Sequence, residues 1–281
     1  WAREIAALGQ EVRLIPPGYV KPYVKHQKND AADAEAICEA VTRPNMRFVP
    51  IKTEEQQSVL VLHRARDLLM RQRTMILNAI RGHLAEFGII AAQGPRQVMG
   101  MIARLRDDGD ASLPEIARSA LLALGAHLEA LAGEIRTLER QLMVWHRADP
   151  TSQRLETIPG VGLITATALA ASVSDPSVFK SGREFAAFLG LVPRQNSSGG
   201  KDRLGRISKM GDRYLRKLLV VGATSVIRRA GSNPTKTGAW VRSLMERKPA
   251  RVVTVAMANK TARIAWAVMT RGEAYRASPI A

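Results

Sequence analysis

The sequence contains a single cysteine, Cys38, among its 281 residues. One cysteine cannot form an internal disulfide, so a disulfide-stapled secreted scaffold is excluded and a reducing cytosol is the expected compartment. We expect Cys38 to be a small packed hydrophobic residue. The five histidines are scattered without the spacing of metal ligands, so the sequence indicates no zinc site.

Long uninterrupted apolar runs are also missing. The closest candidate, residues 157–173, is broken by Pro159, Gly160 and Gly162 and does not reach the ~18 residues of a membrane span. We therefore expect a soluble, cytoplasmic protein with no membrane partner. Apolar residues still make up 46% of the chain, which allows an ordinary packed core, and the length can hold two domains.

Acidic residues are few beside basic ones, with 25 Asp and Glu against 42 Lys and Arg and a net charge of +17. Such an excess favours nucleic acid as the partner, and a basic membrane-surface protein is the competing class. The positive charge is densest between residues 194 and 217, where only Asp202 and Asp212 are acidic. The basic residues there are Arg194, Lys201, Arg203, Arg206, Lys209, Arg213, Arg216 and Lys217.

A short Ser-Ser-Gly-Gly segment, residues 197–200, interrupts this basic stretch. Its glycines permit positive φ angles and close backbone approach, and its serines offer two hydroxyl groups. Two interpretations are open from these residues alone. The segment is either a solvated linker beside a DNA-binding face or a loop that presents a nucleophile.

An acidic pair lies near the start of the chain, where residues 29–41 (NDAADAEAICEAV) predict a helix. Asp30 and Asp33 are three residues apart and therefore share a face of that helix. Two such carboxylates can bind a divalent metal, because Mg²⁺ prefers hard oxygen ligands. The alternative is structural: Asp30 is a good N-cap, and acidic residues in a first turn complement the helix dipole.

The remaining pattern is mostly helical. We expect a helix over residues 1–8 closed by Gly9, a strand over 11–16, a long helix over 53–88 and a Gly/Pro/Asp-rich break over 94–114. Because the chain starts at Trp1 inside a helical pattern, we also expect a segment upstream of it.

Leucines spaced three and four residues apart over residues 121–145 predict a coiled-coil seam. Its partner is either the 53–88 helix or another subunit, and heptads do not distinguish the two.

The second half contains a turn, Ile158-Pro159-Gly160-Val161-Gly162, between two apolar helices. One interpretation is a helix-hairpin-helix whose glycines point backbone N–H groups at a phosphate, and the other is a packing turn between buried helices. Further helices are expected over residues 211–227 and 240–271. Two interpretations are open for Lys260 and Arg263: they face the nucleic acid, or they belong to a solvated helix face, which is the explanation we favour for either residue alone.

Three of these segments resemble the DEDD-type insertion-sequence transposases called the IS-one-ten family. They are the K-x-D-x-x-D-A pattern at residues 28–34, the I-P-G-V-G turn, and the string GLVPRQNSSGGKDRLGRISKMGDRYLRKLLV at residues 190–220. The resemblance covers nearly the whole chain. It implies an enzyme, a transposase or recombinase of mobile DNA that is guided by a bridge RNA.

The resemblance also implies a fold and a site. The fold is mainly α: residues 1–50 as a truncated RuvC-like, RNase H-type α/β piece, residues 51–150 as long helices and a coiled-coil arm, and residues 151–281 as an all-helical transposase domain with a helix-hairpin-helix. Ser198 is the implied nucleophile, with Ser197 as the fallback. Asp30 and Asp33 are the last two acids of an Mg²⁺-binding DEDD set whose first two members are expected upstream of Trp1.

The implied partners are DNA, a guide RNA and further copies of the chain in a homo-oligomer. The residues expected to bind nucleic acid are Gly160, Gly162, Arg194, Lys201, Arg203, Arg206, Lys209 and Arg213. The alternative function is a non-catalytic helix-hairpin-helix DNA-binding remnant of such a transposase.

Overall fold

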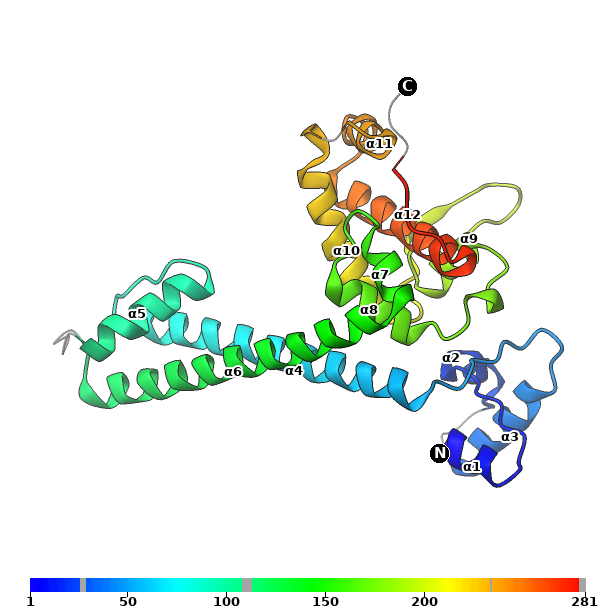
Figure 1. Ribbon diagram of the computed structural model, residues 1–281, viewed down its shortest axis with the longest axis horizontal. Coiled ribbons are helices and arrows are strands. Elements are labelled where there is room, and N and C mark those ends of the chain that lie inside the picture. Colours follow the sequence, from blue (N-terminus) through cyan, green and yellow to red (C-terminus); the bar gives the residue numbers. More distant parts are fainter. Residues whose placement is uncertain (26–28, 108–112, 233, 278–281) are drawn as a thin grey trace.

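The computed structural model describes residues 1–25, 29–107, 113–232 and 234–277. Figure 1 shows three parts: a small amino-terminal unit, a long arm of two helices, and a compact carboxy-terminal cluster above one end of the arm. The only sheet in the described ranges has two strands, so the fold is mainly α as predicted. None of the helices in these ranges is long and apolar enough to cross a membrane.

The amino-terminal unit contains α1 (Ala2–Ala7), α2 (Pro17–Val20), the 3-10 helix η1 (Lys21–Tyr23) and α3 (Asp30–Val41). Gly9 follows α1 with φ +80°, as expected of a residue that ends a helix. The strand predicted over residues 11–16 is wrong, because Leu14 makes only a single bridge, with Val49. A ladder cannot extend from this bridge into Pro16 or Pro50, which lack an N–H group.

Cys38 is exposed, which corrects the expectation that it packs inside. The inward face of α3 instead carries Ala36 and Ala40, both buried.

The arm consists of α4 (Glu54–Glu86) and α6 (Glu115–Ala148), which pack side by side. A capping box between Thr53 and Gln56 starts α4 where the sequence predicted it. The seam of α6 is buried at intervals of seven residues, at Leu121, Leu128, Ile135 and Leu142. Its partner is therefore α4 of the same chain, and the intramolecular alternative is the one observed.

The tip of the arm corrects a third prediction. Residues 95–107 form the helix α5 (Pro95–Asp107) rather than an irregular break. Proline is favoured in the first turn of a helix, and Val98, Ile102 and Leu105 give α5 a buried apolar face. Gly125 of α6 allows α5 to approach closely, because a β-carbon there would overlap Ile102.

The carboxy-terminal cluster contains α7 (Pro150–Glu156), α8 (Leu163–Ser172), η2 (Pro176–Val178), α9 (Gly182–Phe188), α10 (Arg213–Arg228), η3 (Ala230–Ser232), α11 (Lys236–Met245) and α12 (Ala250–Arg271). Its core surrounds α8, in which every residue from Thr165 to Ala171 is buried. Three phenylalanines pack together in this cluster, with the ring centroid of Phe179 5.1 Å from those of Phe185 and Phe188. Buried alanines on α12, such as Ala262 and Ala265, allow α9 and α10 to pack against it.

A buried histidine joins the arm to this cluster. His63 of α4 hydrogen-bonds through Nε2 to Thr167 Oγ1 of α8 (3.0 Å) and through Nδ1 to the Tyr214 hydroxyl of α10 (3.1 Å). Burial and the neighbouring Arg66 lower the pKa of His63 to about 4, and burial raises the pKa of Tyr214 to about 12. Both groups are therefore neutral near pH 7, which suits an uncharged junction.

Candidate nucleic-acid interface and serine hairpin

The Ser-Ser-Gly-Gly segment forms the end of a β-hairpin, between β1 (Pro193–Gln195) and β2 (Leu204–Ile207). At its tip the Lys201 N–H group donates to the Ser198 carbonyl oxygen (3.1 Å). Gly199 (φ +56°) and Gly200 (φ +73°) are both left-handed, as a type I′ hairpin turn requires. The hairpin, yellow-green in Figure 1, extends from the carboxy-terminal cluster with residues 193–206 all exposed.

The two serines of the turn have different surroundings. The Ser197 hydroxyl accepts a hydrogen bond from the Arg203 N–H group (3.1 Å) and donates to Asp202 Oδ1 (3.2 Å), so it holds the strands together. The Ser198 hydroxyl makes no hydrogen bond within the described part of the chain and is exposed. Of the two, Ser198 is the hydroxyl available to an incoming group.

The base of the hairpin is held closed by two glycines. A β-carbon on Gly190 would overlap the Met210 carbonyl oxygen, and one on Gly211 would overlap the Phe188 carbonyl oxygen. Beside them, the Lys209 N–H group donates to the Gly190 carbonyl oxygen (3.1 Å) at an unusual positive φ of 56°. The chain therefore leaves and re-enters the core at nearly the same place.

Basic side chains surround this hairpin without acidic partners. Across the described residues, no ion pair involves Arg194, Lys201, Arg203, Arg206, Lys209 or Arg213. The two acids nearby have other roles: Asp202 binds Ser197, and Asp212 caps α10 by accepting from the Tyr214 and Leu215 N–H groups (2.7 and 2.9 Å). The uncompensated charge makes this surface suited to an anion.

Two other cations of the same stretch are structural. Lys217 pairs with Asp67 of the arm, and Arg216 donates to the Leu189 and Met210 carbonyl oxygens (2.9 and 3.0 Å).

The acidic pair lies at the start of α3. Asn29 caps that helix by accepting from the Ala32 N–H group (2.7 Å), so the cap is not Asp30. Asp30 is exposed and Asp33 half-buried in the first turn, while Lys28 of the same motif lies outside the described residues. Within the described ranges, no three His, Cys, Asp or Glu side chains gather as a metal site would require. The pair can supply two oxygen ligands, and a complete site needs others.

The structure does not bring the acidic pair and the serine together in one chain. In Figure 1, α3 lies in the amino-terminal unit beside one end of the arm, well apart from the yellow-green hairpin. Within one chain, the carboxylates are thus placed away from the Ser198 hydroxyl.

The two glycines of the I-P-G-V-G turn, which links α7 to α8, also have different surroundings. Gly160 (φ +84°) is packed against α10, where a β-carbon would lie 2.8 Å from the Gly222 carbonyl oxygen and 2.8 Å from Val226 Cγ2. Gly162 is exposed and is the N-cap residue of α8. Packing accounts for Gly160, whereas only Gly162 presents exposed backbone at this turn.

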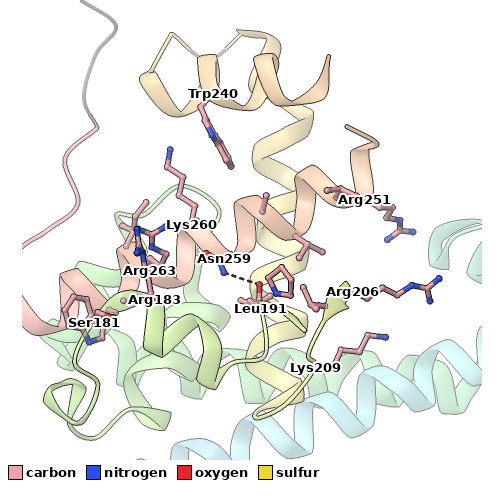
Figure 2. Close-up of a pocket in the computed structure, with 18 of the residues that line it drawn as sticks. Ser181, Arg183, Leu191, Arg206, Lys209, Trp240, Arg251, Asn259, Lys260 and Arg263 are labelled. Atoms are coloured by element: carbon pink, nitrogen blue, oxygen red, sulfur yellow. Dashed lines mark hydrogen bonds between the residues drawn. The ribbon is translucent and has the colours of Figure 1, made fainter. Parts of the chain in front are cut away.

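A groove of about 1410 Å³ lies beside the hairpin, between β2, α9, α11 and α12 (Figure 2). Six cations and no acidic residue line it, namely Arg183, Arg206, Lys209, Arg251, Lys260 and Arg263. The Lys260 ammonium lies 4.5 Å from the centre of the Trp240 ring, and burial together with Arg263 lowers the pKa of Lys260. On the floor, Asn259 Nδ2 donates to the Leu191 carbonyl oxygen (3.1 Å).

Of the six groove cations, sequence reasoning assigned Arg206 and Lys209 to nucleic-acid binding and favoured a solvated helix face for Lys260 and Arg263. The other cations and Trp240 are scattered along three helices, and no local motif connects them. The spacing of Lys260 and Arg263, three residues apart on α12, is the one usable signal, and a solvated helix face explains that spacing equally well.

Comparison with known proteins gives two family matches. The family described as "Transposase IS116/IS110/IS902 family" matches residues 152–238, and the DEDD family of IS110, described as "Transposase", matches residues 4–89.

Individual relatives align along almost the entire chain. "Putative transposase y4pF/y4sB" of Sinorhizobium fredii is 50% identical over 98% of this chain and 71% of its own length. "Probable family 20 transposase" of Pseudomonas aeruginosa is 49% identical over 98% of this chain and 82% of its own. "Transposase for insertion sequence element IS1328" of Yersinia enterocolitica is 44% identical over 98% and 81%. The chain therefore belongs to the IS110 family of insertion-sequence transposases.

Proposed function

We propose that the protein cuts and rejoins DNA with Ser198 as the nucleophile. One observation carries this proposal: an exposed hydroxyl without a hydrogen bond in the described ranges, at the tip of a hairpin whose cations lack acidic partners there. The hairpin can present this hydroxyl to a phosphate, and Lys201 beside it can neutralise the phosphate charge. The neighbouring Ser197 is less suited, because its hydroxyl already bonds to Asp202 and Arg203.

The reaction in this proposal is a transesterification at phosphorus. The Ser198 hydroxyl gives up its proton as a bond forms between Oγ and phosphorus, and the bond from phosphorus to the leaving sugar oxygen breaks. That sugar oxygen takes up a proton, so the DNA end becomes covalently attached to the protein. A sugar hydroxyl of another strand then attacks the same phosphorus, reseals the DNA and returns the serine. One phosphate ester replaces another at each step, so no external energy source is required.

Serine needs assistance near neutral pH, and we assign that role to the Asp30 and Asp33 carboxylates. Their hard oxygen atoms, side by side in the first turn of α3, suit Mg²⁺, which proteins usually hold through one or two carboxylates plus phosphates. When bound, Mg²⁺ would supply positive charge beside the reacting oxygen atoms. Because α3 and the hairpin are apart within one chain, we infer that the carboxylates of one copy act on the serine of another, in a homo-oligomer.

The remaining assignments follow the family. We propose residues 1–50 as part of a RuvC-like layer, residues 51–150 as a coiled-coil arm, and residues 151–281 as the transposase domain, with α7 and α8 as its helix-hairpin-helix. DNA is the substrate and a guide RNA selects the site. The net charge of +17 supports contacts with more than one nucleic-acid strand. Of the two glycines in the I-P-G-V-G turn, Gly162 is the exposed one, and its exposure suits a phosphate contact.

The test is to incubate the full chain with supercoiled DNA, guide RNA and Mg²⁺ and to look for covalent protein–DNA adducts in denaturing gels. We expect Ser198→Ala to abolish the adduct while nucleic-acid binding persists, since one neutral hydroxyl contributes only ~1 kcal/mol to binding. Asp30→Asn and Asp33→Asn should lose the adduct as well. If Ser197→Ala loses the adduct and Ser198→Ala keeps it, the nucleophile is the neighbouring serine. Adducts from both variants would contradict the serine mechanism.

A second candidate is a non-catalytic DNA-binding remnant. It is favoured by one observation, that Asp30 and Asp33 have no third ligand beside them among the described residues. In that case the chain binds DNA through the hairpin cations, and no adduct forms with the unaltered protein under any metal condition.

A further inference from the structure

The groove beside the serine hairpin has a composition unlike the rest of the basic surface. Six cations line it, and in the described ranges none of them forms an ion pair. Between them, the floor and walls carry apolar side chains, including Pro193, Ile207, Val252 and Val255, and the ring of Trp240. A surface that only contacts phosphates has no need of such an apolar centre.

Figure 2 shows how the charged and apolar groups are arranged. Arg183, Lys260 and Arg263 lie at one end of the groove, and Arg206, Lys209 and Arg251 lie at the other. Trp240 extends from α11 towards Lys260, and Leu191 lies between the two groups of cations. The groove is therefore positive at both ends and apolar in the middle.

Duplex and unpaired nucleic acids present different groups to such an arrangement. A duplex keeps its bases stacked inside and presents phosphates and groove edges to such a surface. An unpaired strand exposes apolar base faces together with its phosphates, and proteins bind such strands in positive grooves with aromatic side chains on which bases stack. The cation–π contact of Lys260 with Trp240 (4.5 Å) shows that the ring face is within reach of charged groups in the groove.

The groove is also continuous with the reactive hairpin. Gly205, Arg206 and Ile207 of β2 line it, and β2 leads back to the turn that carries Ser198. From Lys201 at the tip to Gly205 at the groove is ~13 Å along the strand. A DNA strand that reaches Ser198 can thus extend into the groove within a few nucleotides.

We propose that this groove binds an unpaired DNA strand next to the scissile phosphate. One base of the strand stacks on the Trp240 ring, and the phosphates on either side of that base contact the cations at the two ends of the groove. This inference rests on the proposed function of Ser198 for its choice of DNA as the occupant. An anion bound between Lys260 and Arg263 would also relieve their mutual repulsion, which contributes to the lowered pKa of Lys260.

The experiment compares the full chain with Trp240→Ala and Trp240→Phe in fluorescence anisotropy. The probes are a labelled single-stranded DNA of about 12 nucleotides, within the site sizes of such grooves, the duplex of the same sequence, and the matching RNA. We expect Trp240→Ala to weaken binding of the single strand about tenfold, as loss of one base–aromatic stack does, and to leave the duplex unaffected. Trp240→Phe should recover most of the affinity, because a smaller ring still stacks.

A matched pair of charge variants tests the groove without changing Trp240, so the result does not depend on whether Trp240→Ala folds. Arg251→Gln removes a cation from the groove, and Arg136→Gln removes an exposed cation from α6 on the arm. We expect only Arg251→Gln to weaken single-strand binding and to reduce its salt dependence.

Several outcomes would overturn the proposal. They are equal losses on single strand and duplex, a loss confined to the RNA, or a Trp240→Ala variant that binds every probe normally but changes mass in light scattering, which would make the groove an interface between copies. Arg136→Gln serves as the internal reference, because Arg136 lies on the arm and outside the groove. If Ser198→Ala still forms adducts, the serine mechanism fails. The dependence of single-strand binding on Trp240 is judged separately, from the anisotropy data alone.

Discussion

Two glycine-containing turns of this protein, residues 158–162 and residues 197–200, have opposite surroundings. Gly160 sits in a tight turn pressed against α10, where Gly222 and Val226 leave no room for a β-carbon. Gly199 and Gly200 sit at the end of an exposed hairpin, where a β-carbon would meet nothing within 4 Å and only the backbone angle calls for glycine. In the first turn glycine is needed both for space and for its positive φ, and in the second it is needed for conformation alone.

The two turns therefore differ in role: the packed one stabilises the fold, and the exposed one presents side chains to solvent. The packed turn fixes α8 and α10 in the core, so its glycine supports the fold. The exposed turn is not packed against any neighbour and can place a hydroxyl and several cations in solvent. A glycine-rich motif therefore has no single meaning until its surroundings are known.

The largest effect that tests this contrast is expected from Gly222→Ala. A β-carbon at Gly222 would overlap the Gly160 carbonyl oxygen, so the α7–α8 turn and α10 must separate. We expect a loss of about 3 kcal/mol in unfolding free energy, and a fall in Tm on the order of 10 °C.

Gly199→Ala is the matched control. It meets no neighbour and faces only the strain of a left-handed residue, ~1–2 kcal/mol. Equal losses in thermal unfolding would contradict the distinction between the two turns.

The second prediction concerns folding stability at low pH, through a histidine buried near the packed Gly160 turn. His63 bonds to Thr167 on α8 and to Tyr214 on α10, the two helices that meet at the Gly160 turn. Its pKa is about 4 in the folded chain against 6.5 for the free group, so the unfolded chain binds the proton more tightly. Stability is unaffected by this group above pH ~6.5 and falls as the pH drops towards 4, by up to roughly 3 kcal/mol.

The measurement is urea unfolding of the unaltered chain and of His63→Gln between pH 7 and pH 4. The variant starts less stable at pH 7 because the buried contacts change, but it should lose less stability on acidification. If the unfolding free energies of the two proteins fall in parallel with pH, His63 does not contribute to the pH dependence.

The third prediction concerns the exposed serine hairpin and the salt dependence of its DNA binding. Arg203 and Arg206 on the hairpin lack ion-pair partners in the described ranges, and each is expected to contact one phosphate. Replacing both with Ala should reduce the slope of log affinity against log salt by about 1.8 on duplex DNA. Thermal unfolding should stay the same, since neither side chain is buried. An unchanged slope would take these residues out of the interface.

The smallest effect distinguishes the two serines by stability. Ser197→Ala removes the hydroxyl that bonds to Asp202 and Arg203, and we expect it to cost about 1 kcal/mol and to raise hydrogen exchange at the Arg203 amide. Ser198→Ala should leave both measurements unchanged. Protection at Arg203 that is lost in Ser198→Ala instead would reverse the roles assigned to them.

The sequence predicted most of the helices because their apolar residues recur with helical spacing. The expected start of α4 at Thr53 and the leucine seam of α6 are both observed, whereas the N-cap of α3 is Asn29 and not Asp30. It failed where composition outweighed pattern, as in α5, whose Pro95 and Gly100 suggested a break although Val98, Ile102 and Leu105 form one buried face. It also failed over residues 11–16, where a strand-like pattern had no partner with which to form a ladder.

The candidate site was only partly accessible to sequence reasoning. The hairpin cations and serines are neighbours along the chain, so local patterns identify them. The groove is assembled from β2, α9, α11 and α12, and Arg183, Trp240 and Arg251 become neighbours only when those elements pack. The contact between Gly160 and Gly222 joins α7–α8 to α10 in the same way, which is why the turn had two open interpretations.

The closed base of the serine hairpin has a consequence for how such enzymes diversify. Since Gly190 and Gly211 hold both ends of the excursion at one point of the core, the residues between them form a cassette. Insertions, deletions or exchanges within it are expected to change the side chains at the tip of the hairpin without moving α9 relative to α10. Grafting the segment between family members should thus exchange the serine turn and its cations while the packed core keeps its arrangement.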